Sequence, residues 1–580
     1  MKILLSKKIF ACIVLTIGII ITSNAQITNP LKRIFHQQLN ENITHPQSLG
    51  ENNFKGTQTK NAPPIQWQKC IGGTRDDYAQ NAIIKLRDGN FLTCGSTNSH
   101  NGDFDANHGK YDAFLMKTDG KGNILWEKTY GGSGNDALNN MIETSNGDVY
   151  AIGNTTSNDG QVSGNHGGAV YGDIWLIKTN SNGKLLSQRC YGGSGDEWTQ
   201  GLMLTKQGNL VFPAATNSND GDIPTNHGDY DGWIVKLKAS GAIDFSVIIG
   251  DTADDELYTI AVINGNILVG GETSIKNAYD PDVAKYYDAI VAKIDQKGNI
   301  IYFRKYGGSG SDNCNSLVTS SDGNAVLVGH TSSHDGDVPH NNGFDMWIWK
   351  IDVAHNGNII WQNFIGVPKD TAAGFNLTQT HDGGFVIVGG IAPNLLAPYD
   401  TWDVYAAKVN AHGKILWTKK FGGSNFDIIF GVVEENDKSI LIGGATGSND
   451  GDVSGNHGGP EDAWMVDLGR GFGNDDAIAE ESDLKNSILQ ILKLSNYPNP
   501  FTASTTVSFT LLTAQKVTAQ IFDKKGTLIK ILADENMYAG THQLIWNARD
   551  INGNTAEAGV YLLRMQAGTY VETKKIVVLK

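Results

Sequence analysis

The chain of 580 residues is long enough for two to four domains, and its aromatic side chains (9%), few prolines (14) and moderate charged fraction (18%) argue against global disorder. Its formal net charge of −15 argues against nucleic acid or an anionic membrane surface as the main partner.

The N-terminus has the pattern of a secretory signal peptide. Three lysines and an apolar run of about fourteen residues precede Ser23-Asn24-Ala25, so we expect residues 1–25 to be removed after Ala25. The alternative, a transmembrane anchor, is disfavoured because the run is short for a bilayer span. Loss of the lysines takes the charge to −15 − 3 = −18. No later segment is apolar enough to span a membrane, so we expect none in the mature chain.

Residues 26–63 are polar and unpatterned, and we predict a flexible leader there. Residues 64–470 then repeat one phrase, an aromatic segment that ends in Gly-Gly, as in "WEKTYGG" and "WTKKFGG". Its first glycine falls at 72, 131, 192, 250, 307, 366 and 422, in steps of 56 to 61 residues.

Each repeat contains four short apolar or aromatic segments separated by Gly turns, which predicts four antiparallel strands. One such unit cannot bury both of its faces, whereas a radial arrangement buries them between neighbours. We therefore predict an all-β fold with a seven-bladed β-propeller over residues 64–470; a linear solenoid is the alternative. The first repeat begins with the last strand type and the seventh lacks it, so the N-terminal strand would close the ring.

Residues 471–494 are predicted to be a linker, and residues 495–580 a smaller β unit with six strands near 505–512, 516–523, 527–532, 541–547, 558–566 and 569–579. This tail contains "NYPNPF", "AGTHQLIWNARDINGN" and "AGVYLLRMQAGTYVETKKIVVLK" in that order. It resembles the type A C-terminal sorting domain of the Bacteroidetes type IX secretion system. The repeats are more loosely similar to propellers that accompany such domains.

The resemblance implies an immunoglobulin-like sandwich, export across the outer membrane, and the type IX translocon and a sortase as partners. It implies a secreted or surface-anchored location. The alternative is an ordinary sandwich without a targeting role. By the match, nine residues fall on family motif positions: Pro498, Pro500, Gly540, Trp546, Gly553, Gly559, Tyr561, Lys574 and Lys575.

Strand order within a blade places the long loops and the Gly-Gly connections on one face of the propeller, where we expect function. An acidic residue follows Gly-Gly in every repeat, at Asp77, Asp136, Glu197, Asp255, Asp312, Asp370 and Asp427. Another begins the third strand, at Asp112, Asp173, Asp231, Asp288, Asp345, Asp403 and Asp462. Sevenfold recurrence favours a structural role, in which carboxylates accept loop N–H groups.

The long loops carry "DGD" in three repeats and "NHG" in four. The oxygens of Asp220, Asp222, Asp335, Asp337, Asp450 and Asp452 are of the type that calcium prefers, so these residues are candidate metal ligands, although the EF-hand spacing is absent. The alternative is a hydrogen-bonded loop with a packed histidine. One histidine per loop makes zinc a poor candidate. No CxxC pattern or disulfide framework is present, and calcium is the one cofactor considered.

Blades four and six lack both phrases, and structure alone does not demand these departures. They bring aromatic side chains beside carboxylates, a combination that suits sugar rings. The candidate ligand-binding residues are Tyr279, Asp280, Asp282, Tyr286, Tyr287, Tyr399 and Trp402. The alternative is drifted loops without a ligand.

No nucleophile elbow or zincin motif is present, and we assign no catalytic residue. These patterns favour a secreted or cell-surface binding module, with a glycan as the first ligand class and a protein partner as the second. The alternative is a glycoside hydrolase or polysaccharide lyase that uses the propeller mouth, which requires two unique carboxylates.

Overall fold

The computed structural model describes residues 62–104, 106–168, 170–275, 286–339, 341, 343–393, 401–470, 494–511, 515–537, 540–567 and 570–579. The chain divides into two compact units, of which the first ends at Gly471 and the second begins at Phe472. The predicted signal peptide, all but the last two residues of the leader, and all but the last residue of the linker lie outside the described residues.

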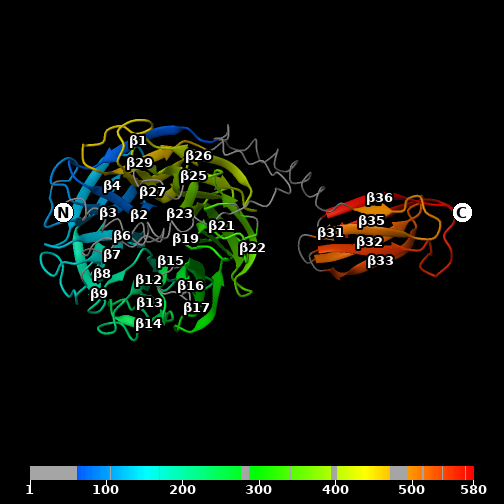
Figure 1. The fold of residues 1–580 in the computed structure, drawn as a ribbon, viewed down its shortest axis with the longest axis horizontal. Helices are drawn as coiled ribbons and strands as arrows, with labels where there is room; N and C mark the ends of the chain where they lie inside the picture. Colours follow the sequence, from blue (N-terminus) through cyan, green and yellow to red (C-terminus); the bar gives the residue numbers. More distant parts are fainter. Residues whose placement is uncertain are drawn as a thin grey trace, which may run out of the picture. The chain divides into compact units, whose positions relative to one another are not determined.

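The first unit is a seven-bladed β-propeller, as predicted, with seven antiparallel sheets arranged around a common centre (Figure 1). The strands of blades one to three are β2 (Asp77–Lys85), β3 (Phe91–Thr97), β4 (Asp112–Thr118), β5 (Ile124–Tyr130); β6 (Asp136–Glu143), β7 (Val149–Thr155), β8 (Asp173–Thr179), β9 (Leu185–Tyr191); and β10 (Glu197–Trp198), β11 (Met203–Leu204), β12 (Leu210–Thr216), β13 (Asp231–Leu237), β14 (Ile243–Ile249).

The strands of blades four to six are β15 (Asp255–Ile263), β16 (Asn266–Ile275), β17 (Tyr286–Ile294), β18 (Ile300–Tyr306); β19 (Ser316–Thr319), β20 (Ala325–Thr331), β21 (Asp345–Asp352), β22 (Asn358–Ile365); and β23 (Thr371–Gln379), β24 (Phe385–Ala392), β25 (Asp403–Val409), β26 (Ile415–Phe421). Blade seven combines β27 (Asp427–Glu434), β28 (Ile440–Thr446) and β29 (Asp462–Leu468) with β1 (Ile65–Ile71).

The N-terminal strand closes the ring, as the incomplete seventh repeat predicts. Strand β1 pairs antiparallel with β29, and Ile71 lies opposite Ala463. Gln68 Oε1 accepts a hydrogen bond of 2.7 Å from Trp464 Nε1, and Gln188 makes the same bond with Trp175 at 3.0 Å within blade two. Strand β1 therefore supplies blade seven with the glutamine that β9 supplies to blade two.

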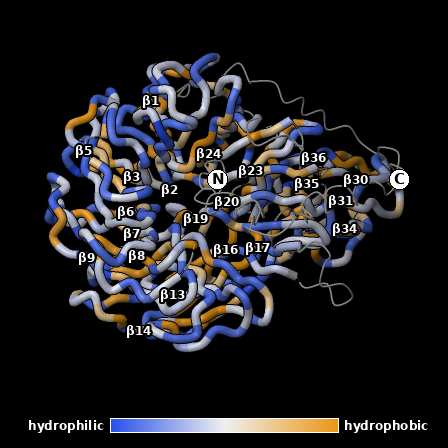
Figure 2. The backbone as a smooth tube through the Cα atoms, turned by 60° about the vertical axis from the view of Figure 1, so that its left-hand side comes forward, coloured by the Kyte–Doolittle hydropathy of each residue, from blue (hydrophilic) through white to orange (hydrophobic). Residues whose placement is uncertain are grey.

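The blades pack face to face on apolar side chains. One buried cluster joins blades one and two through Leu115, Met141 and Trp175, and equivalent clusters join other neighbours. Every residue of β13 is buried, because the third strand lies between two others of its own sheet and between two neighbouring blades. Hydrophobic residues lie along strands such as β13 and β14, and hydrophilic residues are common in the connections (Figure 2). All four described cysteines are buried and free.

Strand direction sorts the connections onto two faces. The first-to-second and third-to-fourth turns are short, as at 86–90 and 119–123 in blade one. The second-to-third loop (98–111) and the Gly-Gly connection (131–135) lie together on the other face, since successive strands are antiparallel. We call this the long-loop face.

The second unit is a small β-sandwich. Its strands are β30 (Ser495–Tyr497), β31 (Thr505–Leu511), β32 (Gln515–Phe522), β33 (Leu528–Met537), β34 (Gly540–Trp546), β35 (Gly559–Ala567) and β36 (Tyr570–Val578). They form a three-stranded sheet in the order β30-β31-β34 and a four-stranded sheet in the order β33-β32-β35-β36. The six predicted strands are all present. In the described part of the chain, no helix combines the length and apolarity needed to cross a bilayer.

Candidate functional site

The acidic residue that begins the innermost strand holds the Gly-Gly turn before it. In blade one, Asp77 Oδ2 accepts hydrogen bonds from the Gly73 amide (2.7 Å) and Ser99 Oγ (2.8 Å), and Oδ1 accepts one from Thr97 Oγ1 (2.5 Å). Burial raises the pKa of Asp77 to about 6, although these bonds oppose the shift. The same amide bond recurs at Asp136, Glu197, Asp312 and Asp427. The structural role predicted from recurrence is confirmed for these residues.

Blade six departs from this pattern. Its innermost strand begins at Thr371, which pairs with Ala392 where blade seven pairs Asp427 with Thr446. Asp370, placed at this position from the sequence, lies one residue before the strand. That assignment is wrong because Thr371, not Asp370, has the same spacing from the first glycine of the turn as the acids of the other blades.

The first aspartate of each "DGD" phrase holds the same turn from the opposite side. Oδ1 of Asp220, Asp335 and Asp450 accepts the amide of Ser194, Ser309 and Ser424, respectively, at 2.7 Å in each case. These backbone bonds lower the pKa of Asp220 and Asp335. The glycine of the phrase has positive φ, 65° at Gly451, and a Cβ there would lie 2.4 Å from Gly422 O. The phrase therefore builds a loop that docks onto the turn.

The second aspartates, Asp222, Asp337 and Asp452, lie beside the same turns. Asp452 Oδ2 accepts the Gly422 amide at 3.3 Å, and the amides of all three donate to the first glycine of the turn. Among the described residues, no three or more His, Cys, Asp or Glu side chains form a group suited to a metal ion. Calcium binding at the six aspartates stays a prediction.

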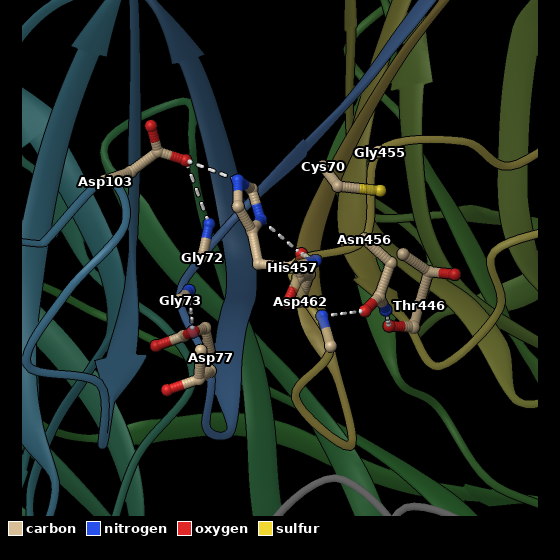
Figure 3. Close-up of polar contacts among 12 residues, drawn as sticks. Cys70, Gly72, Gly73, Asp77, Asp103, Thr446, Gly455, Asn456, His457 and Asp462 are labelled. Atoms are coloured by element: carbon tan, nitrogen blue, oxygen red, sulfur yellow. Dashed lines mark hydrogen bonds and ion pairs between the residues drawn. The ribbon is translucent and has the colours of Figure 1, made fainter.

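The histidine of "NHG" is a hydrogen-bond partner of the aspartate that begins the third strand of its blade. At the closure between blades seven and one, His457 Nδ1 lies 2.6 Å from Asp462 Oδ2, and its Nε2 lies 3.7 Å from Asp103 Oδ2 (Figure 3). Asn456 Nδ2 donates to Thr446 O at 3.5 Å. The Asp462 side chain is fully buried, so the ring supplies a polar partner that water cannot. The same pair joins His108 to Asp112, His166 to Asp173 and His227 to Asp231.

Blades four and six lack this histidine and carry a lysine instead, two residues before the first glycine. Lys420 Nζ lies 2.8 Å from Asp403 Oδ2. Burial and Asp312 raise the pKa of Asp288 to about 6, and Lys305 opposes them. Blade five has Phe364 at the lysine position, and burial alone raises the pKa of its Asp345 to about 6. A basic side chain therefore lies near the third-strand aspartate in six blades: a histidine from the loop in four and a lysine from the outer strand in two.

Two glutamates lie opposite each other in blade four, where sequence reasoning assigned no function. Glu256 and Glu272 are cross-strand neighbours on β15 and β16, with 4% and 3% exposure. Tyr258 Oη donates to Glu256 Oε2 at 2.9 Å. Burial, followed by the charge of Glu256, raises the pKa of Glu272 well above its usual value. The same positions in other blades hold no acid pair: Tyr78/Ser96, Ala137/Asn154, Trp198/Ala215, Asn313/His330, Ala372/Ile391 and Ile428/Ala445. That break in the repeat is the signal that could have revealed the pair.

The acid pair has aromatic neighbours. The Trp198 ring centroid lies 5.3 Å from that of Tyr258. Tyr287 on β17 pairs with Ser274, two residues along β16 from Glu272. Burial raises the pKa of Tyr287, and the charges of Glu272, Glu256 and Asp254 raise it further. We call Glu256, Glu272, Tyr258, Tyr287 and Trp198 the blade-four cluster.

Three of the seven predicted ligand-binding residues, Tyr286, Tyr287 and Trp402, lie in the described part of the chain. Tyr286 is 37% exposed at the start of β17. Trp402 packs on a different aromatic cluster, with Tyr78, Tyr111 and Phe426, and so lies apart from the blade-four cluster. The remaining four, Tyr279, Asp280, Asp282 and Tyr399, lie outside the described residues.

The predicted sorting-signal residues lie in the turns and the core of the sandwich. Trp546 is fully buried and donates from Nε1 to Arg549 O at 3.0 Å, and its ring meets Tyr561 edge-on at 5.1 Å. Tyr561 Oη donates to Glu557 O at 2.8 Å. The others occupy the opening segment (Pro498, Pro500), the start of β34 (Gly540), a tight turn (Gly553), the start of β35 (Gly559) and β36 (Lys574, Lys575).

Residues 495–579 match the family model of the secretion system C-terminal sorting domain. The C-terminal unit is a type IX sorting domain. Such a domain implies export by the type IX secretion system to the cell surface or the medium. This match confirms the resemblance seen in the tail motifs.

Solved structures match the chain at low identity and with TM-scores below 0.4. PorZ of Porphyromonas gingivalis, an essential surface component of the type IX secretion system, is 12% identical, with a TM-score of 0.36 over 89% of this chain and 61% of PorZ. This chain thus spans about 61% of the length of PorZ. A copper-bound fungal alcohol oxidase of the AA5 family is 12% identical (TM-score 0.39, 90% and 100% coverage). The WD40 domain of Neurospora crassa Pan2 is 10% identical (0.38, 70% and 97%). No curated protein matches the sequence.

Proposed function

We propose that the propeller is a binding module that the sorting domain delivers to the cell surface, and that its ligand is a glycan. The repeated acids and histidines have structural partners within their own blades and turns. Specific recognition then falls to the positions where the blades differ. The start of β17 carries the proposal, because Tyr286 is 37% exposed there, beside Tyr287 and the buried carboxylates of the blade-four cluster, and exposed aromatic rings near carboxylates suit sugar faces and hydroxyl groups.

The first experiment is binding of the purified chain to a polysaccharide array, with calcium and with a chelator. We expect retention of at least one glycan, weakened by Tyr287→Phe and by Tyr286→Ala. Phe303→Ala is the matched control, because Phe303 is 41% exposed on the outer strand of the same blade. No retention under either condition would leave a surface protein as the partner to be sought.

The chelator arm separates the two parts of the proposal. Calcium at the "DGD" loops predicts that Asp222→Asn and Asp452→Asn weaken glycan binding and that chelation abolishes it, because carboxylate oxygens would present the ion to sugar hydroxyls. Binding that is indifferent to chelator places recognition on the blade-four cluster alone.

A second candidate function rests on the same acid pair. Glu256 and Glu272 are a unique pair of carboxylates, which a glycoside hydrolase or polysaccharide lyase requires. Glu272, with its raised pKa, would hold the proton that a general acid donates. Release of reducing or unsaturated ends from array-positive polysaccharides, lost in Glu272→Gln, would support it. Binding without turnover would leave the binding module.

We also propose that a sortase removes the C-terminal unit after export and attaches the remainder to the surface. Mass spectrometry of the surface-exposed form tests this: a C-terminus before residue 495 supports removal, and an intact Lys580 contradicts it.

A further inference from the structure

Two acidic side chains with unpartnered oxygens lie on adjoining segments where the ring of blades closes. Asp76 precedes Asp77 in blade one, and Glu461 precedes Asp462 in blade seven. The Asp77 amide donates to Glu461 O at 2.9 Å, which joins the two segments. Asp76 is 9% exposed, and its charge is the first electrostatic influence on Glu461 after burial.

The hydrogen bonds in this region leave one oxygen free on each side chain. Tyr111 Oη donates to Asp76 Oδ2 at 2.6 Å, whereas Asp76 Oδ1 and Glu461 Oε2 are buried without a partner. Burial, Asp76 and Asp427 together raise the pKa of Glu461 to about 8, and no basic side chain in the described part of the chain opposes them. A buried oxygen on each of two carboxylates, without a counter-charge, is an unfavourable arrangement unless a proton or a cation relieves it.

The repeat does not require these two acids. The corresponding pairs at the other six junctions contain at most one: Tyr111/Asn135, Gly172/Asp196, Tyr230/Asp254, Tyr287/Ser311, Phe344/Asp370 and Trp402/Phe426. Asp196 shows the structural use of such an acid, because its Oδ1 accepts the amides of Val170, Tyr171 and Gly172. No amide bond to Asp76 or Glu461 of this kind is found among the described residues, so loop building does not explain their presence.

We propose that Asp76 Oδ1 and Glu461 Oε2 bind one hard divalent cation, calcium or magnesium, at the closure between blades seven and one. Carboxylate oxygens are the ligands such ions prefer, and water can complete the shell because Glu461 is partly exposed. The two ligands come from opposite ends of the ring, so the ion binds the closed propeller and not the unfolded chain. It therefore stabilises the closed state in proportion to its occupancy.

Thermal unfolding of the full chain in millimolar calcium, in magnesium and in chelator tests this, with calorimetric titration of calcium as a second measurement. We expect a higher Tm with the cation and saturable heat of binding. Asp76→Asn and Glu461→Gln keep the side-chain shape and should weaken binding about tenfold or more and abolish the Tm shift. Asp119→Asn, in the short 119–123 turn on the opposite face of blade one, is the control, and it should keep both responses.

Two results would overturn the cation site. One is a wild-type chain whose Tm and titration do not respond to either ion. The other is a response that survives both Asp76→Asn and Glu461→Gln but is lost in Asp222→Asn, which would assign the ion to the "DGD" loops. If a shared proton alone relieves the pair, Glu461→Gln will match or exceed wild-type stability in chelator and neither protein will respond to calcium.

Discussion

Lys420 Nζ lies 2.8 Å from the carboxylate of Asp403, in one of the three blades whose long loop lacks the Asn-His-Gly phrase. In four other blades a histidine Nδ1 lies 2.5 to 3.0 Å from the equivalent carboxylate. The basic neighbour of this partially or fully buried aspartate therefore comes from the long loop in some blades and from the outer strand in others. The histidine of the Asn-His-Gly phrase is therefore explained as the basic partner of that aspartate.

Removal of that partner should be costly only where the aspartate is buried. We expect His457→Ala to lower the free energy of unfolding by about 1–3 kcal/mol, because Asp462 then lacks a side-chain donor in a site without water. His355→Ala is the control, since His355 is 78% exposed beside Asp352 and its pair is worth little. Urea unfolding of both variants checks this. Equal losses would contradict it.

Asp345 should make the propeller less stable as pH rises. Its folded pKa of about 6 exceeds the value of about 4 of an unfolded aspartate, so its stabilising contribution is present below about pH 4 and is lost as pH rises through 6. Asp345→Asn cannot ionise. We expect it to be more stable than wild type by about 1–2 kcal/mol at pH 8, with the difference reduced at pH 4.

Denaturant midpoints at the two pH values measure that difference. Asp322→Asn is the contrasting control, because the hydrogen bond from Lys350 lowers the pKa of Asp322 despite some burial. Its effect has the opposite sign: it destabilises at pH 8 and has no effect at a pH below the folded pKa. An Asp345→Asn variant that is less stable than wild type at pH 8 would contradict the burial argument.

The glycine inside "DGD" should resist substitution because of its neighbours as well as its backbone. A Cβ at Gly451 would lie 2.4 Å from Gly422 O at a φ of 65°, whereas one at Gly458, with φ of 88°, would meet nothing within 4 Å. We expect Gly451→Ala to cost about 2–4 kcal/mol and Gly458→Ala about 1 kcal/mol. Thermal unfolding compares them, and similar losses would show that the loop can move away from the turn.

Substitutions at two adjacent residues of β34 should have very different effects on the stability of the sorting domain. Trp546 is fully buried between Phe501 and Tyr561, and Ile545 is 68% exposed. We expect Trp546→Ala to lower domain stability by about 3–5 kcal/mol and Ile545→Ala by less than about 0.5 kcal/mol. The fluorescence of the domain cannot report on a tryptophan variant, so circular dichroism of the full chain on heating is the measurement.

Deletion of residues 495–580 should stop export without unfolding the propeller, because the two units have separate cores. Cell fractionation checks this: the truncated chain should accumulate in the periplasm, and the full chain should reach the surface or medium. A truncated chain at the surface would contradict the sorting role of this domain.

Periodicity in the sequence predicted most of the fold. The aromatic Gly-Gly segments recur at blade spacing, and the incomplete last repeat predicted that β1 would pair with β29. These predictions held because blade geometry is local: each hairpin is determined by its own turn and alternating side chains. The pattern of the C-terminal segment likewise predicted the six strands of the sandwich.

The contacts between particular side chains of different strands and blades could not be predicted in this way. Glu256 and Glu272 become neighbours only through the register of β15 and β16, and Asp76 and Glu461 only through ring closure. The sequence by itself determined the repeat, the two units and the export signal, because those depend on residues near one another in the chain. Tertiary structure decided which carboxylates are buried, which have partners and which do not, because burial and charge compensation depend on contacts between segments far apart in sequence.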